Sequence, residues 1–214
     1  MPSRSSRAIK SAAATSFVFL NCPFDDQYKP IFEALVFTIH ACGFTARCAL
    51  EDGGSEAVRL QRIIKMIQTC QLGIHDLSRV DTQGQLPRFN MPFELGLFIG
   101  AKTFGDVRQH RKKFLVLEGE RYQHKRFISD ISGQDLKAHN NDAAEAVKSV
   151  REWLSDQAGT KGTVPGRDRI LLLYAQFRET LPGLLEKAGQ DRASMTFKEF
   201  RTYVGEFINA QVAY

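Results

Sequence analysis

Apolar runs of strand length alternate with longer stretches of helical periodicity through the first 120 residues of the chain. Four runs are short, apolar and typical of buried strands: residues 15–20, 44–50, 72–77 and 113–118. Two stretches between them repeat apolar side chains every three or four positions, as helices do: residues 28–42 and 56–70. The second helix is expected to turn four side chains inward: Leu60, Ile63, Ile64 and Ile67. This alternation predicts an α/β fold, with an open parallel sheet and helices on both faces.

Four polar segments lie at one edge of this predicted sheet. They follow its strands or begin a helix: residues 21–26, 47–54, 76–78 and 90–94. Open parallel sheets bind ligands beyond the carboxyl ends of their strands, so the four segments should meet around a ligand. Their convergence is the main reason to expect a binding site.

The pattern beyond residue 120 is less regular. Residues 121–134 indicate a loop with one short helix, and residues 135–139 indicate an edge strand. Asp142 and Glu145 form a capping-box pattern for a helix that continues to Leu154.

A glycine-rich stretch, residues 159–166, is the best candidate for a linker. Two more helices are expected after it, over 167–181 and 197–210, the second with a Thr196–Glu199 capping box. The predicted organisation has four parts: a disordered leader (1–15), an α/β domain (16–158), the linker (159–166) and a C-terminal helical segment (167–214).

The composition is that of an ordinary globular protein with one core: 214 residues, 43% hydrophobic and 25% charged. No apolar run reaches the roughly 20 residues of a membrane span, so no membrane partner is expected. The four cysteines lack CxxC spacing, which argues against a metal site and a disulfide framework and predicts a cytoplasmic location. The net charge of +5 permits an anionic ligand such as a nucleotide.

The strongest functional signal lies in residues 88–100, RFNMPFELGLFIG. Pro92 suits a first helical turn, and apolar side chains follow at helical spacing. Glu94 stands in this apolar helix start, where burying a bare carboxylate is costly. It is either a first-turn glutamate that the helix dipole favours, or a catalytic carboxylate that stabilises an oxocarbenium-like ribose. Asn90, one turn earlier, could cap the helix or orient a ligand.

Asp76 ends a buried strand and is the second candidate catalytic residue, although strand-end aspartates often cap the turn that follows. His75 points to the other face and is interpreted as a packing histidine. Cys22 has no histidine placed to activate it, so a cysteine nucleophile is not expected.

Six more side chains of these loops are candidate substrate-binding residues: Asn21, Pro23, Phe24, Asp25, Arg47 and Ser78. Asn21 and Asp25 also have the character of turn formers. The Pro23–Phe24 pair either places a rigid aromatic ring over a ligand ring or packs into the protein.

Two basic clusters, residues 108–113 and 121–126, are interpreted as solvated loop charges. Only one aromatic side chain, Tyr122, interleaves with them, whereas base-stacking surfaces usually have more, so no nucleic-acid partner is expected. The chain has no GxGxxG or GxxxxGK motif, which removes support for a dinucleotide oxidoreductase or a P-loop ATPase.

The string Arg88-x-Asn90-x-x-Phe93-Glu94-Leu95-Gly96-x-Phe98-Ile99-Gly100 resembles the central motif of TIR-like predicted nucleotide-binding domains. Some of these domains are effectors in bacterial anti-phage signalling. The order of the surrounding segments also matches, and the resemblance covers roughly residues 16–120. TIR enzymes and the related nucleoside 2-deoxyribosyltransferases share a flavodoxin-like layout, and both use a helix-borne glutamate to cleave an N-glycosidic bond.

The resemblance implies that Glu94 is the catalytic residue, that Asp76 matches the strand-end aspartate of the transferases, and that Pro23–Phe24 matches their Pro-Phe pair. The chain departs from both families. The transferase Asp-x-Gly ahead of the glutamate is absent, and Asn-Cys-Pro-Phe-Asp-Asp replaces the serine-rich first loop of TIR domains.

The implied function is hydrolysis of NAD with release of nicotinamide, where NAD is the substrate and no cofactor is needed. TIR effectors become active on assembly, so a homo-oligomer and an activating partner or signal are implied. The first alternative is a nucleoside or nucleotide N-glycosidase or deoxyribosyltransferase, and the second is a non-catalytic nucleotide-binding or sensing module. The C-terminal segment, residues 167–214, is expected to dock on the core or to mediate oligomer contacts.

Overall fold

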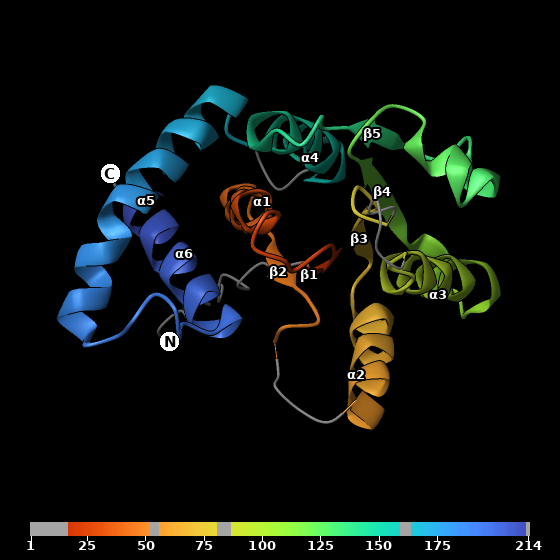
Figure 1. Ribbon diagram of the computed structural model, residues 1–214, viewed down its shortest axis with the longest axis horizontal. Helices are drawn as coiled ribbons and strands as arrows, with labels where there is room; N and C mark the ends of the chain where they lie inside the picture. Colours follow the sequence, from red (N-terminus) through yellow and green to blue (C-terminus); the bar gives the residue numbers. More distant parts are fainter. Residues whose placement is uncertain (1–16, 52–55, 81–86, 159–163, 213–214) are drawn as a thin grey trace, which may run out of the picture.

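The computed structural model describes residues 17–51, 56–80, 87–158 and 164–212. Its centre is one sheet of five parallel strands (Figure 1). The strands are β1 Phe17–Asn21, β2 Thr45–Arg47, β3 Leu72–Asp76, β4 Lys113–Glu118 and β5 Leu136–Ala138. Their order is β2-β1-β3-β4-β5, the flavodoxin-like arrangement whose direction of winding reverses between β1 and β3. The predicted fold class is confirmed.

The register of the sheet decides which strand ends are neighbours. In the β1–β3 pair Asn21 lies opposite His75, so β1 and β3 end side by side. In the β4–β5 pair Glu118 lies opposite Ala138, and both residues are the last of their strands. The carboxyl edge therefore offers two positions for a site, one at the switch point and one over β4 and β5.

Helices cover both faces of the sheet (Figure 1). The helices are α1 Lys29–Ala41, α2 Glu56–Thr69, α3 Asn90–Phe104, α4 Ala143–Ala158, α5 Arg167–Ala188 and α6 Phe197–Val212. Helices α1 and α4 pack on one face of the sheet, while α2 and α3 pack on the other. Strand β1 serves both layers, because Val18 and Leu20 face α1 whereas Phe19 faces α2 and α3.

The C-terminal helices form an additional layer outside α1 and α4 (Figure 1). Phe37 of α1 contacts three of their rings, with centroid separations of 5.3 Å to Tyr174, 5.5 Å to Phe177 and 6.2 Å to Phe207. The segment is thus docked on the core, which was one of the two expectations for it. The predicted leader and most of the predicted linker lie outside the described residues.

Two predictions about helices are wrong. Helix α5 does not stop before Pro182 but continues to Ala188, because Leu181 and Leu185 are both buried against the core. In α2 the predicted inward face is too wide: Leu60 and Ile64 are 42% and 38% exposed. Since α2 buries only a narrow stripe against the sheet and α3, those two side chains remain at the surface.

Three short 3-10 helices complete the described elements: η1 Gln109–Arg111, η2 Gln123–Arg126 and η3 Ser129–Ile131. Lys112, which follows η1, is buried and donates hydrogen bonds from Nζ to the carbonyl oxygens of Ile67, at 2.5 Å, and Cys70. It therefore satisfies carbonyls at the C-terminal end of α2 that the helix itself leaves unpaired. None of the helices in the described ranges is long and apolar enough to cross a membrane.

Candidate functional site

Glu94 is the fifth residue of α3, past the first turn, and lines a pocket of about 240 Å³ between α2 and α3. The alternative of a first-turn glutamate is therefore wrong. The other lining residues are Arg59, Leu60, Ile63, Asn90 and Phe93. The Glu94 residue is 6% exposed, while Phe93 beside it is 53% exposed. The pocket thus joins a recessed carboxylate to an exposed aromatic ring.

The Glu94 carboxylate has no hydrogen bond or salt bridge with any other residue in the described ranges. Burial raises the pKa of its carboxyl from 4.5 to about 7, and the positive charge of Arg59 opposes the rise. Perturbed titratable groups in pockets are candidates for function. A recessed carboxylate without a partner among the described residues is therefore available to a ligand.

The start of α3 is held from the sheet. Asn21, at the end of β1, donates hydrogen bonds from its amide to the Met91 carbonyl, at 2.9 Å, and to Nδ1 of His75, at 3.0 Å. Asn21 is itself buried, so it positions the helix that carries Glu94 and does not line the pocket. Asn90 does not cap the helix, since α3 begins at Asn90 and Phe89 occupies the cap position. It lines the pocket instead.

Asp76 is fully buried and accepts three hydrogen bonds. They come from the Tyr28 hydroxyl at 2.5 Å, the Ser78 backbone N–H at 2.8 Å and Nε2 of His139 at 3.0 Å. Burial acts to raise the pKa of Asp76, but the hydrogen bonds and the nearby His139 outweigh it and hold the pKa below the ordinary value. Asp76 does not line the Glu94 pocket, and its bonds tie the loop after β3 to α1 and to the end of β5.

Asp25 lies at the switch point and forms salt bridges with two arginines. Its Oδ2 atom accepts hydrogen bonds from Arg79 at 2.9 Å and from Arg88 at 2.5 Å. Burial acts to raise the pKa of Asp25, yet the Arg88 hydrogen bond and the Arg79 charge lower it below the ordinary value. The loops that follow β1 and β3 are thereby joined next to the α3 start.

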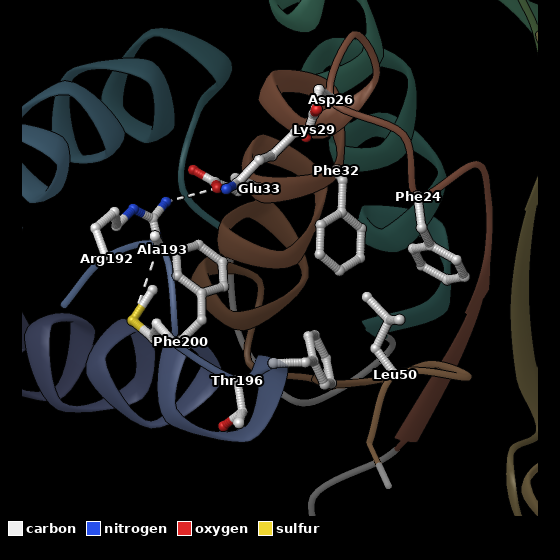
Figure 2. A pocket seen from close by; sticks show the side chains of 12 residues that line it. Phe24, Asp26, Lys29, Phe32, Glu33, Leu50, Arg192, Ala193, Thr196 and Phe200 are labelled. Atoms are coloured by element: carbon white, nitrogen blue, oxygen red, sulfur yellow. Dashed lines mark hydrogen bonds and ion pairs between the residues drawn. The ribbon is translucent and has the colours of Figure 1, made fainter. Parts of the chain in front are cut away.

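Phe24 lines a different pocket, of about 220 Å³, between the loop after β1 and the C-terminal segment. Figure 2 shows Phe24 and Phe32 beside Leu50 on one side of this hollow. Across it, Arg192 forms a salt bridge with Glu33 at 2.6 Å (Figure 2). Phe24 also meets Phe32 edge-on, with centroids 5.5 Å apart. The structure therefore does not bring Phe24 to Glu94.

The remaining predicted residues, Arg47, Pro23 and Ser78, do not line the Glu94 pocket. Arg47 binds Glu51 at 2.8 Å and Thr69 at 3.2 Å, so it ties β2 to the end of α2. Pro23 is buried. The Ser78 hydroxyl is buried without a hydrogen-bond partner among the described residues, while the Ser78 backbone holds Asp76.

His75 is a packing histidine, as predicted. It is fully buried, and its ring meets Phe98, Phe19 and Phe114 edge-on at centroid separations of 5.0, 5.8 and 6.2 Å. Burial lowers its pKa to about 3, which keeps the ring neutral. Cys22 is buried too, and its pKa is raised well above the ordinary value by that burial, so its thiol is a poor nucleophile.

Three arginines contribute to these sites without having been predicted from the sequence: Arg59, Arg79 and Arg88. Arg59 could have been found, because it lies four positions before Ile63 on the same helix and near its N-terminal end. Arg88 belongs to the motif string but was given no role. Arg79 carried no signal, because its partner Asp25 is 54 positions away.

No model of a known protein family matches the chain, and no curated protein matches it in sequence.

Proposed function

We propose that this protein is an N-glycosidase that cleaves the nicotinamide–ribose bond of NAD, with Glu94 as the catalytic carboxylate. The observation that supports it is the Glu94 carboxylate itself, recessed in a pocket and without a hydrogen-bond or salt-bridge partner among the described residues. A structural carboxylate at this depth would be expected to have such a partner. The motif resemblance to TIR-like domains supports the same assignment.

The main requirement of this reaction is a negative charge held beside the ribose. The bond between ribose C1′ and the nicotinamide nitrogen breaks, and its electron pair leaves with nicotinamide. A water oxygen bonds to C1′ and releases one proton. Glu94 stabilises the oxocarbenium-like ribose while the base leaves. Because its pKa is about 7, the carboxylate gains its charge near neutral pH.

The neighbours of Glu94 fit supporting roles in this reaction. The exposed ring of Phe93 offers a face for the departing base, and Asn90 offers a hydrogen-bonding group for ribose. Arg59 brings a positive charge to the same pocket and suits the diphosphate of NAD.

The second candidate is a nucleoside or nucleotide N-glycosidase, or a deoxyribosyltransferase, that uses the same carboxylate. The volume of the pocket favours it, because about 240 Å³ suits a ribose with one base better than a whole dinucleotide. Both candidates predict a free base as product, so the identity of that base separates them.

The test is a chromatographic time course of purified protein at high concentration with NAD, ATP and a panel of nucleosides. Wild type is compared with Glu94→Gln and with Glu206→Gln, which removes an exposed carboxylate on α6. Nicotinamide release by wild type and Glu206→Gln, but not by Glu94→Gln, is expected. The rate should rise as pH passes through about 7, where Glu94 ionises.

Other outcomes are equally informative. Release of a different base that depends on Glu94 would select the second candidate. Product formation that survives Glu94→Gln would remove Glu94 from catalysis. If no product forms while NAD raises the melting temperature, the site is a binding module. Activity that rises faster than protein concentration would support the proposed homo-oligomer, as expected for a defence effector that assembles.

A further inference from the structure

A separate hollow of about 580 Å³ lies over the carboxyl ends of β4 and β5. It shares no lining residue with the Glu94 pocket or with the Phe24 pocket. Its walls include the last residue of β4, Glu118, together with His124 of η2 and Ser132 just after η3. Open parallel sheets bind ligands at this edge, and the proposed N-glycosidase reaction makes no use of it.

Three side chains in the hollow form a carboxylate–imidazole–hydroxyl chain. Nδ1 of His124 lies 2.8 Å from Oε2 of Glu118, and both residues are buried. Nε2 of His124 lies 3.2 Å from the Ser132 hydroxyl oxygen, and Ser132 is exposed. This is the order of groups that activates a serine nucleophile in hydrolases of unrelated folds.

Glu118 fixes the tautomer of His124. Besides Nδ1, its carboxylate accepts the backbone N–H groups of Tyr122, at 2.8 Å, and His124, at 3.1 Å. A carboxylate with three donors remains an acceptor, so the His124 ring proton belongs on Nδ1. Nε2 then presents its lone pair to Ser132, whose hydroxyl also reaches the Ser129 carbonyl at 2.7 Å. Rotation about the Cβ–Oγ bond moves the hydroxyl proton between these two acceptors.

The backbone after Ser132 supplies a donor for an oxyanion. The N–H of Gly133 has no hydrogen-bond partner in the part of the chain that the structure describes. Gly133 also has a φ of 103°, a conformation that side-chain-bearing residues rarely adopt. In hydrolases of the nucleophile-elbow type the N–H that follows the nucleophile belongs to the oxyanion hole.

Unusual backbone conformations gather around the same hollow. The non-glycine residues with positive φ in the described ranges are Tyr122 at 66°, Asn140 at 52° and Asn141 at 54°. Tyr122 and Asn140 line the hollow, and Asn141 is the next residue along the chain. Such conformations cluster at functional sites, where the surrounding structure holds them in place.

We propose that this hollow is a second catalytic site, a serine hydrolase site in which Ser132 is the nucleophile, His124 the base and Glu118 its orienting carboxylate. The hollow is lined by four basic residues (Arg121, Lys125, Lys137 and Lys148) and three glutamates (Glu118, Glu145 and Glu152). Because Glu118 is bonded to His124 and Glu145 lies 3.8 Å from Lys148, the substrate class is a polar acyl ester with an anionic group. The Ser132 oxygen bonds to the acyl carbon while Nε2 takes the hydroxyl proton. The ester C–O bond breaks, and the leaving alkoxide takes that proton. Water then repeats the sequence and releases the acid.

The test uses the full chain and a fluorophosphonate probe. The phosphorus–fluorine bond of the probe breaks as the Ser132 oxygen bonds to phosphorus, and the hydroxyl proton leaves as HF. Intact mass and peptide mapping should place one adduct on Ser132 in wild type. The adduct should be absent in Ser132→Ala and retained in Ser129→Ala, which removes an exposed hydroxyl three positions away. Glu94→Gln should also be labelled, which separates this proposal from the N-glycosidase.

Hydrolysis of the p-nitrophenyl hemiester of succinic acid provides the second readout, with p-nitrophenyl acetate for comparison. Ser132→Ala and His124→Asn should each lower the rate at least about 100-fold. Retained melting temperatures show that these variants still fold. Each rate is taken after subtraction of the protein-free rate, because the succinate carboxylate attacks its own ester and releases p-nitrophenol unaided. A larger protein-dependent rate for the succinate supports the anionic substrate class, and a smaller one overturns that class. A wild type that is not labelled at Ser132, or a Ser132→Ala variant that hydrolyses esters at the wild-type rate, overturns the proposal.

Discussion

The hydroxyl of Tyr28 donates a hydrogen bond of 2.5 Å to the Asp76 carboxylate, and both residues are buried. The bond joins the residue before α1 to the last residue of β3, which are 48 positions apart. It lies beside the switch point of the sheet, where the loops after β1 and β3 meet. The buried polar side chains at that edge of the sheet therefore stabilise the fold even when no ligand is bound.

Replacing Tyr28 by phenylalanine should lower the free energy of unfolding by about 1–3 kcal/mol, because the buried Asp76 carboxylate loses one donor. Urea denaturation measures the change. Tyr203→Phe is the matched control, since its hydroxyl bonds Gln190 at the surface, and it should cost less than about 1 kcal/mol. If the free energy of unfolding fell equally in the two variants, the buried Tyr28–Asp76 bond would contribute no more to stability than the surface bond of Tyr203.

Glu94→Gln should stabilise the protein in a pH-dependent manner. The folded pKa of about 7 lies above the ordinary 4.5, so between these values the folded state binds more protons than the unfolded state. The free energy of unfolding of wild type therefore falls as pH rises through this window, by up to about 3 kcal/mol. Glutamine does not ionise, so the free energy of unfolding of Glu94→Gln should not fall in this way. Above pH 7 the variant should therefore be more stable than wild type.

Thermal melts of wild type and Glu94→Gln at pH 4, 6 and 8 measure this difference. Glu206→Gln, which changes an exposed carboxyl, should show almost none. A difference between wild type and Glu94→Gln that is the same at all three pH values would contradict the perturbed pKa.

Lys112→Met should destabilise the fold by about 2–3 kcal/mol. Methionine has no ammonium group, so it leaves the carbonyls of Ile67 and Cys70 without their donor. It also removes the charge of Nζ, which lies 4.4 Å from the centroid of the Phe98 ring. The exposed neighbour Lys113 gives the control, because Lys113→Met should stay within about 0.5 kcal/mol of wild type. Denaturant midpoints for the two variants that agree with each other would refute the capping role.

Phe177→Ala should cost about 3–5 kcal/mol, since the ring is fully buried between α1 and α6. Trp153 of α4, the one tryptophan of the chain, reports on the helix layer that covers the sheet. Its fluorescence and the far-UV circular dichroism should change at one denaturant concentration, and that midpoint should fall in the variant. Leu172→Ala, at an exposed position of α5, is the control with little expected change.

Separate transitions for fluorescence and circular dichroism would contradict a shared core. They would instead support the independent C-terminal segment of the predicted domain organisation.

The elements that local pattern controls were predictable from the sequence. Strand β4 begins and ends at the predicted residues 113 and 118, because its apolar run is bounded by charged side chains. The capping box of Thr196 and Glu199 is formed as expected, with bonds of 2.8 and 3.3 Å. Such signals involve neighbours in the chain, so the sequence alone expresses them.

The pairings across the carboxyl edge were not predictable in this way. His139 reaches Asp76 over 63 positions, and Arg88 reaches Asp25 over the same separation. The sequence next to Arg88 or His139 does not indicate which residue is its partner, because the sheet topology brings the two members of each pair together. For the same reason Phe24 was expected near Glu94, whereas it lies against the C-terminal segment.

The layer formed by α5 and α6 has a consequence for how the protein is made. Helix α1 is synthesised before α5 and α6, and the three aromatic rings that contact Phe37 belong to those two later helices. Until α5 and α6 are synthesised, the nascent chain therefore exposes apolar surface on α1, and exposed apolar surface favours chaperone binding. A translation product truncated before α5 would leave this apolar surface of α1 exposed. Such a fragment should be prone to aggregation and should be recognised by chaperones and proteases.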